Sequence, residues 1–548
     1  MPLHDPVSIE TGLVAGFPSE HKPSVTIFRG VPFAASTAGE NRWRAPQPAE
    51  PWSGARDCTQ FGPIAPQLPP GPLYWTEEHL QPRQSEDCLN LNLWTPAQPE
   101  DLGQAKYPVY VWIYGGKFLW GAGTDNNFDG TSLAAKGVIV ITFNYRLGIL
   151  GWLAHPALSA ESGHNASGNY GLLDQIACLQ WIQRNIKAFG GDPGRVTIGG
   201  QSAGSACVGL HLYGPESKGL FHGVISQSGT RHPRDPLISC LAPSYRTKDQ
   251  AESEGEMILA EKGAKDISDM RAMSLEKLLE GNHRDDTTMW GPPPFYRACL
   301  DGWLFPRTYE DTLLQGTMND VPLLNGQNAD ESGNYTHPDF NDQDLDEVAR
   351  IKYGPLSERW FQLYGDDGEG TTATALDKWN AACRDNSRVG PHLHHELWAR
   401  HAKSDIFIYF WTHAPPPRRG FRTDYPVPKA KGYVFFNGSR TGAYHAAEIP
   451  YVFDSLWTAP WDPYTDVDRG VADMASELWA NFIKTGNPNG VKDGGNRHGA
   501  PQLAPWPTAA EDPDHVMEIG KEMRLIPNAK SKEREKFWKD YFAIQKVW

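Results

Sequence analysis

The sequence predicts an α/β protein with a large, mostly parallel, twisted sheet flanked by helices. Short, unbroken runs of apolar and largely β-branched residues recur along the chain, and such runs are typical of strands covered on both faces. Between two of these runs, residues 174–189 carry Ile176, Leu179, Ile182 and Ile186 at helical spacing. Strands that alternate with helices indicate an α/β architecture.

Six apolar runs are expected to form strands of this sheet. They are residues 109–114, 138–143, 196–198, 224–226, 321–324 and 406–411. The long segment 235–320, which separates two of them, is expected to be largely helical and inserted. The chain shows no internal repeat, low-complexity tract or obvious linker, so nothing in its composition marks a domain boundary.

Composition excludes several classes of function. The chain has a net charge of -15 and a pI of about 5.6, without a Lys/Arg cluster, which argues against nucleic acid or an anionic membrane as partner. No run of 18 apolar residues occurs, so we expect no transmembrane segment. The first residues lack the features of a signal peptide. We therefore expect a cytoplasmic protein, or a secreted one if a signal has been removed.

A nucleophile motif lies at residues 200–204. Residues 200–204 read Gly-Gln-Ser-Ala-Gly, directly after the strand-like run VTIG and before a plausible helix. This G-x-S-x-G context places the serine on a tight strand-to-helix turn with its Oγ pointing out of the sheet. The alternative is a chance match in a Gly-rich turn. The strand and helix on either side favour Ser202 as a nucleophile.

Two blocks carry a family resemblance. FGGDPGRVTIGGQSAG and EDCLNLNLWTP resemble the two signatures of type-B carboxylesterases, the family of cholinesterases and fungal lipases, with a departure at Asn90. Further similar blocks run in the family's order and cover essentially the whole chain. The resemblance implies one α/β-hydrolase domain over residues 1–548, with a gorge-like active site. It implies a monomer or homodimer that hydrolyses small-molecule or lipid esters and needs no cofactor or metal.

The resemblance also assigns an acid and a base to the serine, which needs both. Glu331 follows the strand-like run VPLLN and matches the family's acid, with Asp330 as the rival. His445 matches the family's base through the pattern Gly-x-x-His-x-x-Glu, formed with Gly442 and Glu448. The chain order serine, acid, histidine is that of the α/β-hydrolase fold.

One group of histidines offers an alternative chemistry. His392, His394, His395 and Glu396 are close in sequence, and His392 and Glu396 are four residues apart, which could suggest a metal site on a helix face. No third, distant ligand is indicated. We therefore expect surface histidines on a helix and no bound metal.

Acyl transfer needs N–H donors for the developing oxyanion. One should be the amide of Ala203, and the others should come from the turn formed by Gly115, Gly116 and Lys117. The family has three glycines at this turn, so Lys117 adds a Cβ and a cation. If the lysine faces the substrate and does not point to solvent, it would favour an acyl group that bears a carboxylate. Arg231 and Arg234 would strengthen that preference if they face the same pocket, and the alternative is that they are surface charges.

The resemblance implies further supporting residues. Ser228 matches a family serine that hydrogen-bonds near the acid, and Gln201 stands where cholinesterases carry glutamate, which argues against choline esters. Cys58 and Cys88 match a family disulfide that forms in secreted relatives, and two free thiols are the alternative if the protein is not secreted. The pairs Arg42 with Glu86 and Arg146 with Asp174 resemble structural ion pairs of the family.

Two other functions stay open at this point. An acyltransferase or biosynthetic enzyme could use the same acyl-enzyme while excluding water. A non-catalytic adhesion protein similar to the neuroligins is disfavoured, because those relatives lack the serine.

Overall fold

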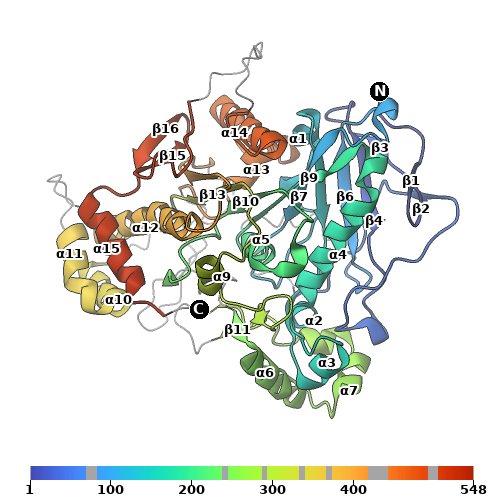
Figure 1. The fold of residues 1–548 in the computed structure, drawn as a ribbon, viewed down its shortest axis with the longest axis horizontal. Helices are drawn as coiled ribbons and strands as arrows, with labels where there is room; N and C mark the ends of the chain where they lie inside the picture. The colour runs from blue at the N-terminus through green and yellow to red at the C-terminus, as the bar shows by residue number, and fades with distance from the viewer. Residues whose placement is uncertain are drawn as a thin grey trace.

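Among the residues that the structure describes, a sheet of 11 strands forms the centre of the molecule (Figure 1). The computed structural model describes residues 2–68, 83–236, 245–286, 293–331, 340–365, 373–416, 442–490 and 504–546. The strand order is β16-β15-β14-β13-β10-β9-β7-β8-β6-β4-β3. The strands from β8 to β15 in this order pair in parallel, whereas pairs at both ends of the sheet are antiparallel.

In chain order, the strands of the central sheet are β3 (Phe17–Pro18), β4 (Thr26–Pro32), β6 (Asn90–Thr95), β7 (Tyr107–Ile113), β8 (Ile139–Phe143), β9 (Gly191–Gln201), β10 (Gly223–Gln227), β13 (Leu323–Asn328), β14 (Ile406–Trp411), β15 (His515–Ile519) and β16 (Met523–Pro527). Two small sheets contain β1 (Val7–Ile9), β2 (Gly12–Ala15) and β5 (Ala55–Asp57), and β11 (Arg246–Thr247) and β12 (Cys299–Leu300).

Helices cover both faces of the central strands. In Figure 1, α4 (Tyr170–Asn185) and α5 (Ala203–Tyr213) lie on one side of the sheet, and α1 (Thr131–Ala135) and α14 (Asp466–Thr485) lie on the other. Every residue of β8, β10 and β14 is buried. Two-sided burial explains why these strands are apolar throughout and do not alternate with polar residues.

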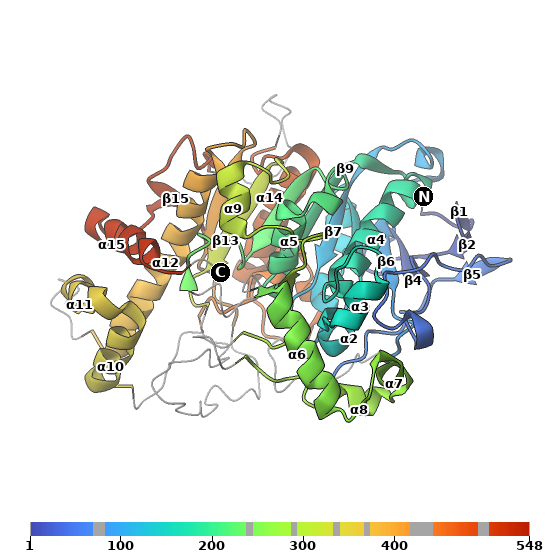
Figure 2. The same cartoon turned by 60° about the horizontal axis from the view of Figure 1, so that its bottom comes forward.

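The described residues form further helices around these layers. They are α2 (Gly148–Trp152), α3 (Pro156–Glu161), α6 (Lys248–Glu261), α7 (Ile267–Ala272), α8 (Leu275–Leu279), α9 (Tyr309–Gln315), α10 (Asp342–Tyr353), α11 (Ser357–Tyr364), α12 (Ala375–Trp398), α13 (Ile449–Val452) and α15 (Lys532–Ala543). Figure 2 shows α6, α7 and α8 together below the sheet. Helices α10, α11 and α15 pack with part of α12 around a separate apolar cluster that includes Trp360 and Trp538.

The strand predictions are confirmed at all six positions. The predicted runs correspond to β7, β8, β9, β10, β13 and β14, and their ends shift by a few residues. The described part of segment 235–320 contains α6, α7, α8 and α9, as expected. In the part of the chain that the structure describes, no helix has the length and apolarity that crossing a bilayer requires.

Both ion pairs implied by the resemblance are present and buried. Arg42 Nη2 lies 2.6 Å from Glu86 Oε2, and Arg146 Nη2 lies 2.6 Å from Asp174 Oδ1. The predicted disulfide is not shown, because Cys58 and Cys88 are both buried but unbonded. Burial raises the pKa of the Cys58 thiol to about 11.

Candidate active site

Ser202 occupies the sharp turn between β9 and α5. Its φ of 59° is positive, a conformation that costs a non-glycine residue energy and marks strained functional turns. The Ser202 N–H donates to the Gln227 carbonyl at 3.0 Å, which fixes the turn against β10. A Cβ on Gly204 would lie 1.9 Å from the Ile113 carbonyl oxygen, so only glycine fits there. The turn therefore holds Ser202 at the N-terminus of α5, where the helix dipole is positive.

His445 and Glu331 are hydrogen-bonded to each other. His445 Nδ1 lies 2.5 Å from Glu331 Oε2. The other carboxylate oxygen, Oε1, accepts from Ser228 Oγ at 2.6 Å and from the Asn328 N–H at 2.7 Å. Burial by itself would raise the pKa of Glu331, but the charge and hydrogen bond of His445, the charge of Arg231 and the hydrogen bond from Ser228 hold it below its usual value. The carboxylate is therefore ionised and fully engaged, and Ser228 contacts it as expected.

Asp330 has a different set of partners from those of its neighbour. Its Oδ1 accepts from Arg384 Nη2 at 2.6 Å, and its Oδ2 accepts from the Ala443 N–H at 2.8 Å. The Asp330 N–H in turn donates to the Ala443 carbonyl at 3.0 Å. Asp330 thus ties the segment that carries His445 to the end of β13, while Glu331 contacts the ring.

A second buried carboxylate supports the same segment. Glu448 accepts from Gln227 Nε2 at 3.0 Å and from Asn328 Nδ2 at 2.6 Å, and the same Asn328 amide donates to the Tyr444 carbonyl at 2.7 Å. Burial raises the pKa of Glu448, with a further contribution from Glu331. Sequence reasoning used Glu448 only as part of a pattern and missed Asn328, which no motif marks.

The glycine turn after β7 packs directly against the Ser202 turn. A Cβ on Gly115 would lie 2.6 Å from the Gln201 carbonyl oxygen and 3.1 Å from Ser202 Cβ. Gly116 has a φ of 112°, and a Cβ there would lie 2.2 Å from the Trp120 carbonyl oxygen. The turn therefore lies beside the serine, as oxyanion-hole donors require. Ala203, the remaining predicted donor, follows Ser202 and is buried.

The side chain of Lys117 is exposed. Its surroundings include His283, whose ring stacks on Trp120 with 5.6 Å between centroids, and Asp285. Desolvation raises the pKa of Asp285 and lowers that of His283, and the charge of Lys117 lowers both. The ammonium group thus lies near the segment that precedes β12.

The other two predicted cations do not join Lys117. Arg231 is buried, and its guanidinium donates to Gln327 Oε1 at 3.0 Å and to Asp235 Oδ2 at 3.2 Å. Arg234 donates to Glu310 Oε1 at 2.7 Å. Each arginine is bound to a carboxylate, which offsets its charge, and a contribution of either to the acyl pocket stays a prediction.

Gln201 contacts the imidazole of His445. Its side-chain Nε2 lies 3.1 Å from His445 Nε2 and 3.4 Å from Nδ1. The glutamine is buried. It thus lies between the glycine turn, the serine and the histidine.

The histidine cluster on α12 is not a surface feature. His392 and His394 are buried, and burial lowers the pKa of each to about 3. His394 Nε2 lies 2.6 Å from the Tyr213 hydroxyl, and Glu396 pairs with Lys539 at 2.9 Å. Across the described ranges, no three His, Cys, Asp or Glu side chains come together as a metal site would need.

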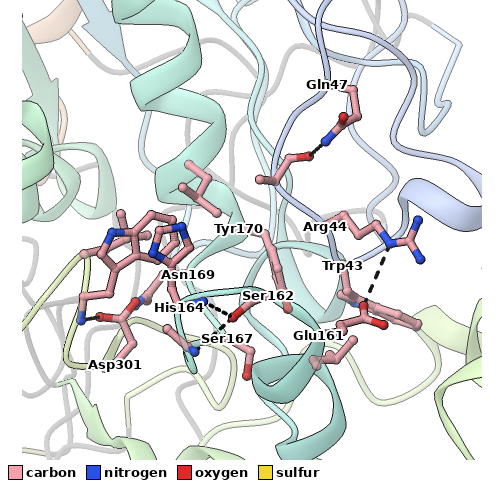
Figure 3. A pocket seen from close by; sticks show the side chains of 16 residues that line it. Trp43, Arg44, Gln47, Glu161, Ser162, His164, Ser167, Asn169, Tyr170 and Asp301 are labelled. Atoms are coloured by element: carbon pink, nitrogen blue, oxygen red, sulfur yellow. Dashed lines mark hydrogen bonds and ion pairs between the residues drawn. The ribbon is translucent and has the colours of Figure 1, made fainter.

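A cavity of about 300 Å³ lies away from these residues (Figure 3). Trp43 and Arg44 line one side, and the stacked rings of His164 and Trp303 line the other. None of its lining residues belongs to the candidate site. It is therefore separate from the site around Ser202.

Known proteins resemble this chain over nearly its whole length. The model of the carboxylesterase family matches residues 4–538. A fumonisin B1 esterase from Sphingopyxis macrogoltabida is 33% identical over 492 residues, which cover 88% of this chain and 82% of that protein. A para-nitrobenzyl esterase from Bacillus subtilis (strain 168) is 30% identical over 551 residues, 98% of this chain and 99% of that protein. A solved PNB esterase structure has a TM-score of 0.74 at 28% identity and covers 98% of this chain and 99% of that one.

Proposed function

Because this chain belongs to the carboxylesterase family, has the α/β-hydrolase fold and hydrolyses carboxylic esters, we propose that Ser202, His445 and Glu331 carry out that hydrolysis. The observation that supports the triad most strongly is the 2.5 Å contact between His445 Nδ1 and Glu331 Oε2. A carboxylate on Nδ1 leaves Nε2 as the basic nitrogen of the ring. Nε2 is the atom that must take the serine proton.

The mechanism runs through an acyl-enzyme. Ser202 Oγ attacks the ester carbonyl carbon while His445 Nε2 takes the hydroxyl proton, and the amides of Gly116, Lys117 and Ala203 donate to the oxyanion. The imidazolium then protonates the leaving alcohol as the C–O bond breaks. Water gives a proton to the same nitrogen and attacks the acyl carbon. The bond from this carbon to Ser202 Oγ then breaks, the imidazolium returns the proton to Oγ, and the acid is released. Glu331 stays ionised and stabilises the imidazolium in both halves of the reaction.

Replacing the nucleophile tests this proposal. We expect Ser202→Ala to lower kcat by at least a thousandfold, since only binding and the oxyanion hole would remain. An organophosphate should label Ser202 alone, as read by mass spectrometry of the digested protein. Ser205→Ala is the matched control, because Ser205 lies on the same helix and its hydroxyl bonds Ser226 at 2.6 Å. Label on another serine, or near-normal activity of Ser202→Ala, would overturn the assignment.

We also propose that the substrate is a small-molecule ester whose acyl group bears a carboxylate. The support is Lys117, a cation at the turn expected to hold the reacting carbonyl. Because its side chain is exposed, solvent screens its attraction, and a contribution of about 1 kcal/mol, or about fivefold, is realistic. The ratio of kcat/KM for a monomethyl dicarboxylate to kcat/KM for its dimethyl ester should fall by that factor in Lys117→Gly. An unchanged ratio would mean that Lys117 does not contact the substrate.

The relatives suggest which esters to test first. One acts on fumonisin B1 and another is named for para-nitrobenzyl esters, so both compounds belong in the first substrate panel. A series of p-nitrophenyl esters from acetate to palmitate, with and without micelles, separates an esterase from a lipase. Activity confined to micellar long-chain esters would contradict the small-molecule assignment.

A further inference from the structure

The side-chain amide of Gln67 forms two hydrogen bonds with the backbone of Gly121. The Gly121 N–H donates to Gln67 Oε1 at 2.9 Å, and Gln67 Nε2 donates to the Gly121 carbonyl at 3.0 Å. Gln67 Nε2 also donates to the Ala65 carbonyl at 3.0 Å. A backbone N–H only donates and a carbonyl only accepts, so these partners fix which end of the amide is oxygen. Gln67 is 7% exposed, so water does not compete freely for these bonds.

Gly121 ends the glycine turn that follows β7. Inside this turn, the Gly116 carbonyl accepts from the N–H groups of Leu119 and Trp120 at 2.9 and 3.1 Å. A Cβ on Gly121 would lie 2.8 Å from the Gly115 carbonyl oxygen, so the end of the turn packs against its beginning. The hydrogen bonds that hold Gly121 therefore also restrain the residues at the start of the turn.

The backbone of Gln67 is held independently of the turn. Its own N–H donates to Gln84 Oε1 at 2.9 Å. The side-chain amide of Asn90, the first residue of β6, donates to the Pro63 carbonyl at 2.9 Å. A substitution of the side chain at position 67 thus removes the two bonds to Gly121 and leaves these supports in place.

We propose that Gln67 is a positioning residue that fixes the turn 115–121 in the geometry that the oxyanion requires. The inference rests on the proposed oxyanion hole, formed by the amides of Gly116, Lys117 and Ala203. Such donors stabilise the developing charge because they are preorganised at its position. A misplacement of about 1 Å can cost about a hundredfold in rate.

The contact of Gln67 with Gly121 should act on the transition state more than on substrate binding. Gln67 bonds the backbone at the end of the turn and none of the three amides that are proposed to donate. Its loss removes no donor and only allows the donors to move. An ester carbonyl in the ground state has little charge and tolerates such movement, whereas an oxyanion does not.

Two matched ketones test the inference as inhibitors. Ser202 Oγ adds to the carbonyl carbon of an alkyl trifluoromethyl ketone, the hydroxyl proton goes to His445, and the ketone oxygen becomes an oxyanion. The methyl ketone with the same alkyl chain is not activated for this addition and reports binding alone. We measure both inhibition constants, and kcat/KM for p-nitrophenyl acetate, in wild type and in Gln67→Met, with thermal unfolding to verify that the variant folds.

Gln183→Met is the matched control. The Gln183 amide donates to the Pro193 and Leu220 carbonyls at 3.0 and 3.1 Å. These carbonyls lie near the beginnings of β9 and β10, whereas Ser202 follows the end of β9. The control therefore loses two amide hydrogen bonds to backbone carbonyls without a contact to the turn.

Methionine has nearly the shape of glutamine but forms none of the three amide bonds. We expect Gln67→Met to lower kcat/KM by about tenfold to a hundredfold and to weaken the trifluoromethyl ketone by the same factor. The inhibition constant of the methyl ketone should stay within about twofold of wild type, because the ground state is unaffected. Gln183→Met should change none of these values. If Gln67→Met does not fold, Gln67→Ala carries the same test with a smaller side chain.

Two results would overturn the inference. An unchanged inhibition constant of the trifluoromethyl ketone in Gln67→Met, whatever happens to kcat/KM, means that the turn keeps its geometry without these bonds. Equal weakening of both ketones means that Gln67 shapes the binding pocket and not the oxyanion hole. Failure of the proposed triad is distinct, because the trifluoromethyl ketone would then bind wild type no more tightly than the methyl ketone.

Discussion

Replacing Glu331 by glutamine keeps the size of the side chain and removes its charge. The new oxygen can still accept from Ser228 and from the Asn328 N–H, which bond Oε1 of the carboxylate at 2.6 and 2.7 Å. The new NH₂ group then faces His445 Nδ1, where the carboxylate accepted a proton at 2.5 Å. Two donors cannot bond, so the ring must move its proton to Nε2, the atom that has to take the serine proton.

The size of the effect follows from this tautomer. In serine hydrolases a neutral amide in place of the triad acid lowers kcat by about 10⁴, which corresponds to about 5 kcal/mol of transition-state stabilisation. Asp330→Asn is the matched control. Asparagine keeps an acceptor for the Ala443 N–H and loses only the ion pair with Arg384, whose side chain is 40% exposed. The carboxylate of this pair is buried, at 7% exposed, so its loss lowers stability, which the unfolding measurement reads separately from activity.

The assay is kcat/KM for p-nitrophenyl acetate at pH 8, with thermal unfolding of both variants to verify that they fold. We expect Glu331→Gln to lose about four orders of magnitude in kcat/KM and Asp330→Asn to lose less than threefold. A larger loss in Asp330→Asn would refute the reasoning, since it would identify Asp330 as the acid. Equal losses would mean that both carboxylates act only by holding the His445 segment.

Three further predictions concern the site and the fold. The variant that combines Ser202→Ala with His445→Ala should be hardly less active than either single variant, because the two residues act as a unit; losses that multiply would contradict this. Under oxidising conditions Cys58 and Cys88 should form a disulfide, whose loop of roughly 30 residues would add about 3–4 kcal/mol in the chain-entropy model; peptide mapping without reductant that finds both thiols unbonded would count against it. Asp174→Ala should lower the free energy of unfolding by about 3–5 kcal/mol, because its arginine partner would stay buried and unpaired, and an unchanged urea midpoint would contradict that.

The central strands were predictable because burial on both faces requires a run of consecutive apolar residues. In β8 and β14 every side chain is buried, so the run is apolar from end to end. The edge strands lack such a run. Residues of β16 are mostly exposed, and β4 is interrupted by Arg29 and Gly30 where its register shifts. Their pairing depends on distant segments, which a local pattern does not report.

The candidate site likewise contains some residues that the local sequence identifies and others that it does not. Ser202 was predictable because the strand-turn-helix context and the glycines of its motif are local. Only the family resemblance favoured Glu331 over Asp330 as the acid partner of the histidine. Adjacent residues at a strand end face different directions, and in this chain one reaches Ala443 and the other His445. The contact of Gln201 with His445 had no local signal, since it depends on how two distant segments meet.

Charged and polar residues were misplaced by sequence reasoning where their partners lie far along the chain. Arg231 was expected on the surface or near the acyl pocket, and the surface position is wrong, because it is buried among Gln327, Asn386 and other polar groups. His392 and His394 were expected on a surface, but α12 packs against β13 and β14 on one side and against α10, α11 and α15 on another. A helix covered on several sides buries polar residues that a single amphipathic face would expose.

The turn proposed to hold the oxyanion has lysine in place of a third glycine, and the space around each of its three positions explains why only the third can carry a side chain. At Gly115 a side chain would lie 2.6 Å from the Gln201 carbonyl oxygen, and at Gly116 it would lie 2.2 Å from that of Trp120. At Lys117 the side chain is exposed, so a Cβ has room there. The remaining requirement is a φ of 54°, which lies in the left-handed region and costs a residue other than glycine about 1–2 kcal/mol. The backbone N–H is unaffected by the side chain, so the turn can keep its donor and gain a cation. Lys117→Gly should therefore keep hydrolysis of neutral esters and raise the free energy of unfolding by the strain it relieves, less the entropy that an added glycine costs.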